Sequence, residues 1–364
     1  MKLSWTLSRY IATQFIFGVL VMLGTFLAFI FLLDIVELMR NFSGRAEVSF
    51  STIVGLALLK LPHMVEEILP FAVLFGSMLA FTRMTRNHEL VVVRASGVSV
   101  WQFLMPGLLV AFASGVLLIT VYNPIASTFF RQYEETQSEF LLSDSRLLQV
   151  SREGLWLRQG SLDGQSVIHA LGVQDRGRQL EDVIVFRYQG TDKWTGRIDA
   201  RSATLENGYW EIRDARVTDA GKPTVLRAVY ELPTSLTYEQ IQDSFASPDT
   251  MSIWELPRFI RVAEAAGFSA LRHRVHWHTV LATPVLLCAM VLIAATFSLR
   301  LTRLGGVSRL VIAGIISGFV LYFLSDLASA LGLSGNLPAV LAAWSPSFIA
   351  LLLGLTTLLY LEDG

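Results

Sequence analysis

The chain has 364 residues, of which 53% are hydrophobic and 16% charged, and its 29 lysines and arginines nearly balance its 30 aspartates and glutamates. Soluble domains are usually about a quarter charged, so this composition indicates a membrane protein and excludes a disordered chain, a coiled coil or a nucleic-acid binder. The charge is unevenly placed, because residues 131–274 hold 39 of the 59 charged side chains. The sequence therefore predicts an apolar membrane part joined to a polar insert.

Long runs without charge predict where the chain crosses the membrane. A helix rises about 1.5 Å per residue, so a bilayer core about 30 Å thick takes roughly 20 apolar residues. We expect six such helices, and the second is the weakest because Lys60, Glu66 and Glu67 interrupt it. The predicted spans are residues 10–33, 53–82, about 101–125, 275–299, a segment that begins at residue 310, and 338–361.

The short segments between these spans differ in charge. Residues 83–94 carry three arginines against Glu89, and residues 300–309 carry three arginines and no acid. The opposite short segments mix Asp34, Glu37 and Glu47 with their bases. Because lysines and arginines favour the cytoplasmic side, we expect both termini in the cytoplasm and the polar insert outside. The predicted order is spans 1–3 within residues 1–130, an external domain, and spans 4–6 within residues 275–364.

The insert alternates apolar and polar residues through much of 147–232, which is the pattern of strands with one buried face. Turn pairs such as Asn207-Gly208 and Ala220-Gly221 punctuate it. We therefore expect an all-β domain at residues 131–248, built as an antiparallel sandwich, jelly roll or partly open barrel. A free edge of such a domain could accept a strand from a similar domain.

The pattern changes after the insert. Ser252-Ile253-Trp254-Glu255 has the form of a capping box and Gly267 that of a helix stop, so an amphipathic connector helix is predicted within residues 249–274. The basic and aromatic residues 272–278 follow at the outer mouth of the fourth span. They predict either an interfacial anchor or, through Arg272 and Arg274, a site for anionic lipid headgroups.

Motifs for nucleotide hydrolysis and nucleophilic catalysis are absent: the sequence holds no G-x-x-x-x-G-K-[ST], G-x-S-x-G or H-E-x-x-H. The single cysteine, Cys288, lies in an apolar run. His276 and His278 would point to different faces of a helix, which disfavours a metal site. We therefore expect no catalytic residues, bound metal or cofactor in this chain.

Three acids, Glu66, Glu67 and Asp326, fall inside predicted spans. Charges at membrane depth usually face a cavity or another helix, but near the interface they also reach the headgroups, and both explanations stay open here. A proton relay through these acids is a further alternative. In the fifth span, Gly314 and Gly318 form a G-x-x-x-G, which predicts the close approach of another helix.

The most informative stretch is residues 86–97, between the second and third spans. It predicts a short helix with Glu89 in its first turn and Gly97 as its stop, and the apolar residues 90–93 lie between its charged ends. Such a helix on the membrane surface is either an amphipathic connector or a docking helix for a soluble protein.

Four segments resemble the lipopolysaccharide export permease family LptF/LptG, and more closely its G subunit. They are Arg9-Tyr10-Ile11, residues 89–97 with the sequence ELVVVRASG, Gly154-Leu155-Trp156 and Met251-Ser252-Ile253. The order of three spans, an outer domain and three spans is similar too.

The resemblance implies the permease subunit of an ABC transporter that extracts lipopolysaccharide from the outer leaflet of the bacterial inner membrane and passes it to a periplasmic bridge. The implied partners are a homologous LptF-type permease, a dimeric cytoplasmic LptB-type ATPase, and LptC- and LptA-type bridge proteins. The ATPase alone would use ATP and Mg, which fits the missing phosphate motif. It would bind the coupling helix through Glu89, Leu90, Val91, Arg94 and Gly97.

The same resemblance implies bases at the outer end of the first span that face the lipid A phosphates, here Arg40 with Arg45 nearby. Because Asp34 and Glu37 stand in the same stretch where another base is expected, headgroup binding would also depend on Arg272, Arg274 or divalent cations. The first and fifth spans would line an apolar cavity and meet the partner permease.

Two other classes of function stay open. A proton-coupled secondary transporter predicts transport without an ATPase and an internal repeat that relates the two halves of the chain. A membrane-anchored assembly protein predicts that Glu89→Ala is harmless, whereas the permease hypothesis predicts that this change uncouples or disassembles the complex.

Overall fold

The computed structural model describes residues 5–42, 49–142, 155–161, 164–174, 178–189, 193–234, 247–265, 270–301 and 307–363. The chain forms two compact units. The first, here named the membrane unit, comprises residues 1–136, 249–254 and 271–364, and the second, the β unit, comprises residues 137–248 and 255–270.

Six helical runs of the membrane unit are long and apolar enough to cross a membrane, which confirms the predicted number within the described residues. The third run, Val100–Gln137, passes through a π-helical turn. The helices are α1 (Trp5–Asn41), α2 (Phe50–Arg86), α4 (Val100–Leu117), the π-helical turn η1 (Leu118–Tyr122), α5 (Asn123–Leu142), α8 (Leu271–Leu301), α9 (Val307–Leu333) and α10 (Ala339–Asp363).

Two helices continue beyond the boundaries predicted from charge. The first does not end at residue 33 but runs to Asn41, so Asp34 and Arg40 lie on a helix rather than in a loop. The third span continues into α5 as far as Leu142, past the predicted limit of residue 130. Charged residues such as Glu, Arg and Lys form helices well, so charge marks where a helix leaves the bilayer and not where it ends.

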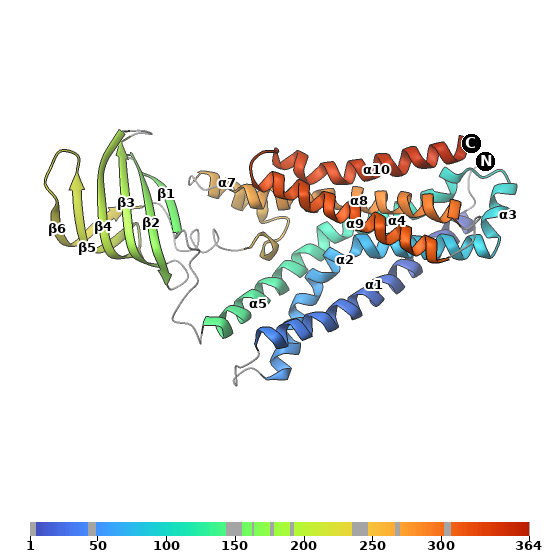
Figure 1. The fold of residues 1–364 in the computed structure, drawn as a ribbon, viewed down its shortest axis with the longest axis horizontal. Coiled ribbons are helices and arrows are strands. Elements are labelled where there is room, and N and C mark those ends of the chain that lie inside the picture. The colour runs from blue at the N-terminus through green and yellow to red at the C-terminus, as the bar shows by residue number, and fades with distance from the viewer. Residues whose placement is uncertain are drawn as a thin grey trace. The chain divides into compact units, whose positions relative to one another are not determined.

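The membrane unit is built around α8, which packs against α2, α4, α9 and α10, while α1 packs against α2 and α4 (Figure 1). Its apolar core includes the fully buried side chains of Phe15, Phe81 and Phe103. The described beginning of α1 and the end of α10 lie at the end of the bundle that carries the short helix α3 (Figure 1).

Helices α1 and α2 touch through their backbones. A Cβ atom added at Gly18 would lie 2.5 Å from the carbonyl oxygen of Gly76, and one added at Gly76 would lie 2.5 Å from Cα of Val19. Real Cβ atoms do not approach other atoms so closely, so both positions need glycine. The pair fixes where the two helices cross.

The β unit contains a six-stranded antiparallel sheet in the order β1 to β6, which confirms the inserted all-β domain. Gly208 and Gly221 adopt φ angles of +88° and +77° in the turns that were predicted there. The described strands form one meander, and closure into a jelly roll stays a prediction. The strands are β1 (Leu155–Ser161), β2 (Gly164–Gln174), β3 (Gln179–Gln189), β4 (Lys193–Glu206), β5 (Tyr209–Asp219) and β6 (Val225–Pro233).

The sheet bends along one row of residues that crosses β3, β4 and β5. In this row Asp182 on β3 and Asp214 on β5 have φ angles of +49° and +55°, and both stand opposite Arg201 on β4. The strand pairs keep the same register on both sides of the row. Along β3, the buried side chain after Leu180 is Val183, three positions later, whereas a regular strand would bury every second residue. Aspartate tolerates the left-handed conformation, so the bend keeps one face of the sheet buried along its whole length.

The connector between the units differs from the predicted capping box. Helix α7 (Leu256–Ala265) begins after Glu255, whose carbonyl oxygen accepts the amides of Arg258 and Phe259 at 3.1 and 3.0 Å. The prediction of Ser252 as the cap was wrong, since the helix begins only at Leu256 and its first turn is closed on Glu255. The predicted stop at Gly267 lies outside the described residues.

Candidate functional site

The short helix α3 (Glu89–Ala95) occupies the position of the predicted coupling helix. At the start of this helix, the amide of Val92 donates a hydrogen bond to the carbonyl oxygen of His88 at 3.2 Å. After its end, Gly97 adopts a φ angle of +80°. A left-handed residue is the usual end of a helix, as the sequence predicted.

The apolar residues of α3 divide between two environments. Leu90 is 7% exposed and joins the core of the membrane unit, with Val93 packed against the same core. Val91 and Val92 point away and are 60% and 68% exposed. The core therefore holds the helix in place and leaves an adjacent apolar pair open to lipid or to another protein. The side chain of Arg94, the other predicted coupling residue, lies outside the described part of the structure.

Glu89 points toward α1. Its Oε1 accepts hydrogen bonds from the hydroxyl of Tyr10 and from Nδ2 of Asn87, both at 3.1 Å. Its Oε2 is buried and has no hydrogen bond among the described residues. The carboxylate thus links α3 to the first span, a contact that was not predicted from the sequence.

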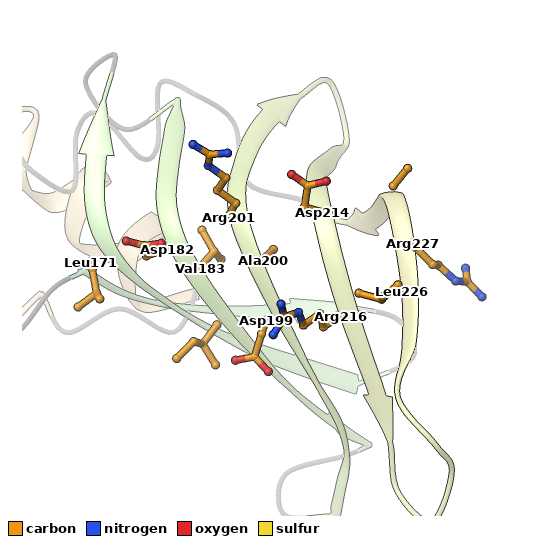
Figure 2. Close-up of a pocket in the computed structure, with 12 residues that line it drawn as sticks. Leu171, Asp182, Val183, Asp199, Ala200, Arg201, Asp214, Arg216, Leu226 and Arg227 are labelled. Carbon is orange, nitrogen blue, oxygen red and sulfur yellow. The ribbon is translucent and has the colours of Figure 1, made fainter.

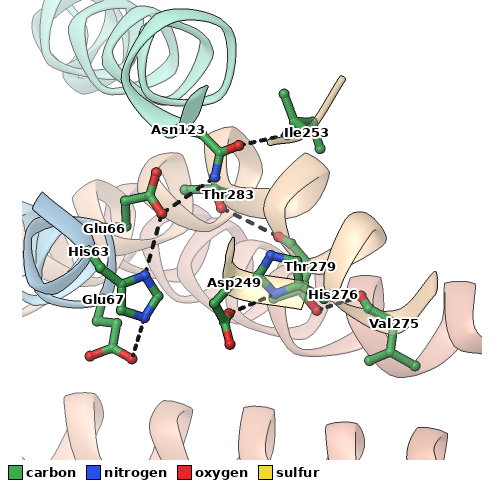
Figure 3. A network of polar contacts seen from close by, with 10 residues as sticks. All are labelled: His63, Glu66, Glu67, Asn123, Asp249, Ile253, Val275, His276, Thr279 and Thr283. Carbon is green, nitrogen blue, oxygen red and sulfur yellow. Dashed lines mark hydrogen bonds and ion pairs between the residues drawn. The ribbon is translucent and has the colours of Figure 1, made fainter. Parts of the chain in front are cut away.

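Glu66 and Glu67 on α2 belong to a cluster of polar side chains (Figure 3). Oε2 of Glu66 accepts Nδ2 of Asn123 at 3.4 Å and lies 4.0 Å from Nδ1 of His63, and Nε2 of His63 lies 3.5 Å from Oε1 of Glu67. The Glu66 side chain is 15% exposed and that of Glu67 is 69% exposed. Of the two explanations left open, Glu66 therefore fits a helix-facing role and Glu67 a surface role.

Asp326 is exposed on α9 and takes no part in this cluster among the described contacts. The structure therefore does not bring the three membrane acids together, and the secondary transporter built on them is not favoured.

The cluster extends to the return segment from the β unit, residues 249–254, which we call the strap. Oδ1 of Asn123 accepts the amide of Ile253 at 2.8 Å, and Asn123 itself is only 3% exposed (Figure 3). Asp249 lies 3.3 Å from Nδ1 of His276 on α8. Asn123 was not predicted as a site residue, because a single asparagine in an apolar stretch carries no local pattern that separates a contact from an isolated polar residue.

Asp34, near the C-terminal end of α1, has an ion-pair partner that was not predicted from the sequence. Nζ of Lys60 on α2 lies 2.6 Å from Oδ1 of Asp34, whose side chain is 5% exposed, and lies over the ring of Tyr133 at 5.7 Å. Asp34 is thus neutralised within the chain rather than directed at a headgroup. Arg40 stays exposed in the last turn of α1.

The other predicted headgroup bases are placed as follows. Arg272 is exposed and Arg274 half-buried in the first turn of α8, and Arg45 lies outside the described residues. Lipid binding by these arginines stays a prediction.

Gly314 and Gly318 face α2 of the same chain. Added Cβ atoms would lie 2.9 Å from Cε1 of Phe75 and 3.3 Å from Cδ1 of Phe71, respectively. The G-x-x-x-G of α9 therefore accommodates aromatic side chains inside this chain, and contact with a partner permease at these glycines stays a prediction.

The β unit carries a hollow of about 760 Å³ on the sheet face that lies opposite its core (Figure 2). Three aspartates and three arginines surround it, so its charges balance and favour neither an anion nor a cation. Its lining residues are Leu171, Asp182, Val183, Ile184, Asp199, Ala200, Arg201, Asp214, Arg216, Leu226, Arg227 and Ala228.

Among the described residues, no group of three or more His, Cys, Asp or Glu side chains is arranged to hold a metal ion. The contacts described above lie between helices, at α3 and at α1–α2, and between the third span and the strap.

Comparisons with known proteins agree with this geometry. The lipopolysaccharide export system permease protein LptG of Escherichia coli K12 is 23% identical over 315 residues, which cover 83% of this chain and 84% of that protein. LptG of Haemophilus influenzae is 21% identical over 358 residues, which cover 94% and 95% of the two chains. The family model described as "Lipopolysaccharide export system permease LptF/LptG" matches residues 9–360, and the chain therefore belongs to this family.

Proposed function

We propose that the chain is the LptG-type permease subunit of an exporter that extracts lipopolysaccharide from the outer leaflet of the inner membrane. It pairs with a homologous LptF-type permease and is driven by a separate dimeric ATPase of the LptB type. The β unit passes the glycolipid to LptC- and LptA-type bridge proteins in the periplasm. The family membership and the six apolar helices with an inserted β sheet support this proposal.

The observation that carries it is the division of α3. A helix that only connected two spans would not need a fixed position, yet Leu90 and Glu89 hold α3 in place. The same helix exposes Val91 and Val92 side by side. An anchored helix with an exposed apolar pair is what a soluble motor needs in order to push on a membrane protein. ATP and Mg are then bound by the motor, and this chain transmits force.

The orientation follows from the same assignment. The ATPase requires α3 to face the cytoplasm. The beginning of α1 and the end of α10 lie at the same end of the bundle as α3 (Figure 1). The positive residues of 83–94 agree, because lysines and arginines favour that side. Both termini are therefore cytoplasmic and the β unit is periplasmic.

Extraction also sets an energetic requirement. Each acyl CH₂ group exposed to water costs about 0.8 kcal/mol, so several acyl chains need a continuous apolar shield. The exposed apolar faces of α1 and α9, with Phe29 and Phe319 more than half exposed, supply surface for a cavity shared with the partner permease.

The test is co-purification. The chain is tagged at its C-terminus, extracted in mild detergent, and the associated proteins and lipids are identified by mass spectrometry. We expect an ATPase, a second six-span permease and lipopolysaccharide, with the ATPase lost in Val91→Asp/Val92→Asp and retained in the matched control Ser96→Ala. Recovery of the chain reproducibly without ATPase or glycolipid would contradict the proposal.

A further inference from the structure

The third span is interrupted at one place, where its hydrogen bonds change from the α to the π pattern. The amide of Asn123 donates to the carbonyl of Leu118, five residues earlier. Pro124 follows, and proline both lacks an amide N–H and presses its ring against the carbonyl four residues before it, here Thr120. The proline therefore accounts for the widened turn and leaves the Thr120 carbonyl without its regular helical donor.

The strap makes hydrogen bonds with the third span at this interruption. Nε1 of Trp254 donates to the freed carbonyl of Thr120 at 3.4 Å, and the amide of Ile253 donates to Oδ1 of Asn123 at 2.8 Å. Eight residues beyond Asn123 on α5, about two helical turns, Nε of Arg131 donates to the carbonyl of Thr250 at 3.3 Å. The strap is thus bound to the third span by three polar contacts that are unrelated to secondary structure.

Burial strengthens these contacts. Thr250, Met251 and Ile253 are 3%, 8% and 3% exposed, respectively, although they lie outside the α-helices and strands. A buried amide N–H is stable only with an acceptor, so Asn123 determines where Ile253 can lie. Met251 and Ile253 are also residues that carry the sequence resemblance, and the structure gives them a physical role.

Asn123 faces two elements at once. While its Oδ1 holds the strap, its Nδ2 donates to Glu66 on α2, the helix that packs against α1, α8 and α3 (Figure 3). We propose that Asn123 is a positioning residue that links α2 to the strap, so that a shift of α2 at Glu66 alters the docking of residues 249–254. Helix α7 of the β unit begins two residues beyond the strap, so the chain itself carries that change to the β unit.

The proposal rests on the export function for its physiological meaning, but its first test does not require transport. Hydrogen–deuterium exchange of the purified full-length chain in lipid nanodiscs is measured by mass spectrometry over residues 249–254. We expect Asn123→Ala to speed exchange at Ile253 roughly three- to tenfold, because one buried hydrogen bond is lost. Peptides from α8 serve as the internal reference for global unfolding.

The discriminating variant is Glu66→Ala, since Glu66 has no hydrogen bond with the strap among the described residues. We expect it to speed exchange at Ile253 through Asn123, whereas the matched control Glu67→Ala, on the neighbouring and exposed carboxylate, leaves exchange unchanged. If Asn123→Ala does not fold, Asn123→Asp keeps an acceptor for Ile253, removes the donor to Glu66 and adds a negative charge beside it, so it should break the link to α2 at least as strongly as Glu66→Ala. Unchanged exchange in Glu66→Ala would overturn the link.

The second test uses the assembled exporter in proteoliposomes. We expect Glu66→Ala to lower the amount of lipopolysaccharide released per ATP hydrolysed while the ATPase stays bound, and Glu67→Ala to match the wild type. Normal release by a Glu66→Ala chain whose strap exchanges faster would overturn the transport role. Absence of release by the wild-type assembly would instead contradict the proposed export function and leave the exchange result intact.

Discussion

The hydroxyl of Tyr10 donates a hydrogen bond to Oε1 of Glu89 across 3.1 Å, although 79 residues separate the two in the sequence. Tyr10 lies in the second turn of α1, and Glu89 is the first residue of α3. The hydrogen bond therefore connects the position of α3 directly to the first span. Two of the segments that resemble the permease family meet at this contact.

The first prediction removes this hydrogen bond alone. Tyr10→Phe keeps the ring and deletes the hydroxyl, so among the described contacts Asn87 is the donor that remains to Oε1 of Glu89. We expect the ATPase to remain bound, because Val91 and Val92 are unchanged, and the lipopolysaccharide released per ATP to fall several-fold. The measurement is the ratio of release to hydrolysis in proteoliposomes, and a ratio equal to that of the wild type would contradict the coupling role.

The second prediction separates the two faces of α3. Leu90→Ala removes a buried side chain and should cost about 2–5 kcal/mol of stability, whereas Val92→Asp on the exposed face should cost less than about 0.5 kcal/mol. Binding should show the reverse order, with Val92→Asp weakening association with the ATPase more than Leu90→Ala does. Thermal unfolding and co-purification on the same samples check both, and equal effects on binding would argue against Val92 as the contact.

The sequence predicted the parts of the molecule that depend on local pattern. Apolar runs defined the six spans, period-two alternation defined the strands, and Glu89 with Gly97 defined α3. Each of these patterns is formed by residues of a single helix or strand, so it can be recognised without knowledge of the fold.

The parts that the sequence did not predict depend on pairs of distant residues. Asp34 looked like a loop acid because its partner, Lys60, stands 26 positions away on another helix. Asn123 looked like an isolated polar residue because Glu66 and Ile253 lie 57 and 130 positions away. Helix ends were misjudged for a related reason, since a helix that leaves the bilayer keeps its hydrogen bonds and only changes its surface.

The third prediction concerns the backbone contact between α1 and α2. Gly76→Ala places a Cβ atom 2.5 Å from Cα of Val19, so the helices must separate or the protein must unfold. Gly55→Ala on the same helix meets nothing within 4 Å and is the matched control. We expect Gly76→Ala to lower the melting temperature clearly and Gly55→Ala to leave it unchanged or raised, because alanine favours a helix over glycine by about 1 kcal/mol.

The fourth prediction concerns the ion pair of Asp34 and Lys60. Because the Lys60 side chain is 28% exposed, water screens part of the interaction, and we expect a coupling energy of about 1–2 kcal/mol rather than the larger value of a fully buried pair. A double-mutant cycle with Asp34→Asn and Lys60→Met measures it by thermal unfolding. Glu37→Gln, on an exposed acid of the same helix, should show no coupling to Lys60→Met beyond about 0.5 kcal/mol. A cycle that closes to zero for Asp34 would show that the pair contributes no stability.

The fifth prediction tests the core of the β unit. Trp210 is fully buried, and its Nε1 donates to Oε1 of Gln159 at 3.3 Å, while Nε2 of Gln159 donates to the carbonyl of Pro233 at 3.1 Å. Gln159 thus ties β1 to β5 and to the end of β6, which are not neighbours of β1 in the sheet order. Gln159→Leu has a similar volume but leaves the indole N–H of Trp210 without this acceptor, and we expect a loss of about 1–3 kcal/mol.

Hydrogen exchange of β1 and β5 amides in the full-length chain measures this loss. Trp210→Phe in the Gln159→Leu background removes the orphaned donor, so the double variant should lose less stability than the sum of the two single changes. Strictly additive losses would show that the Gln159–Trp210 hydrogen bond contributes nothing beyond packing. A sub-additive result would instead identify the buried amide as the contact that joins strands far apart in the sheet.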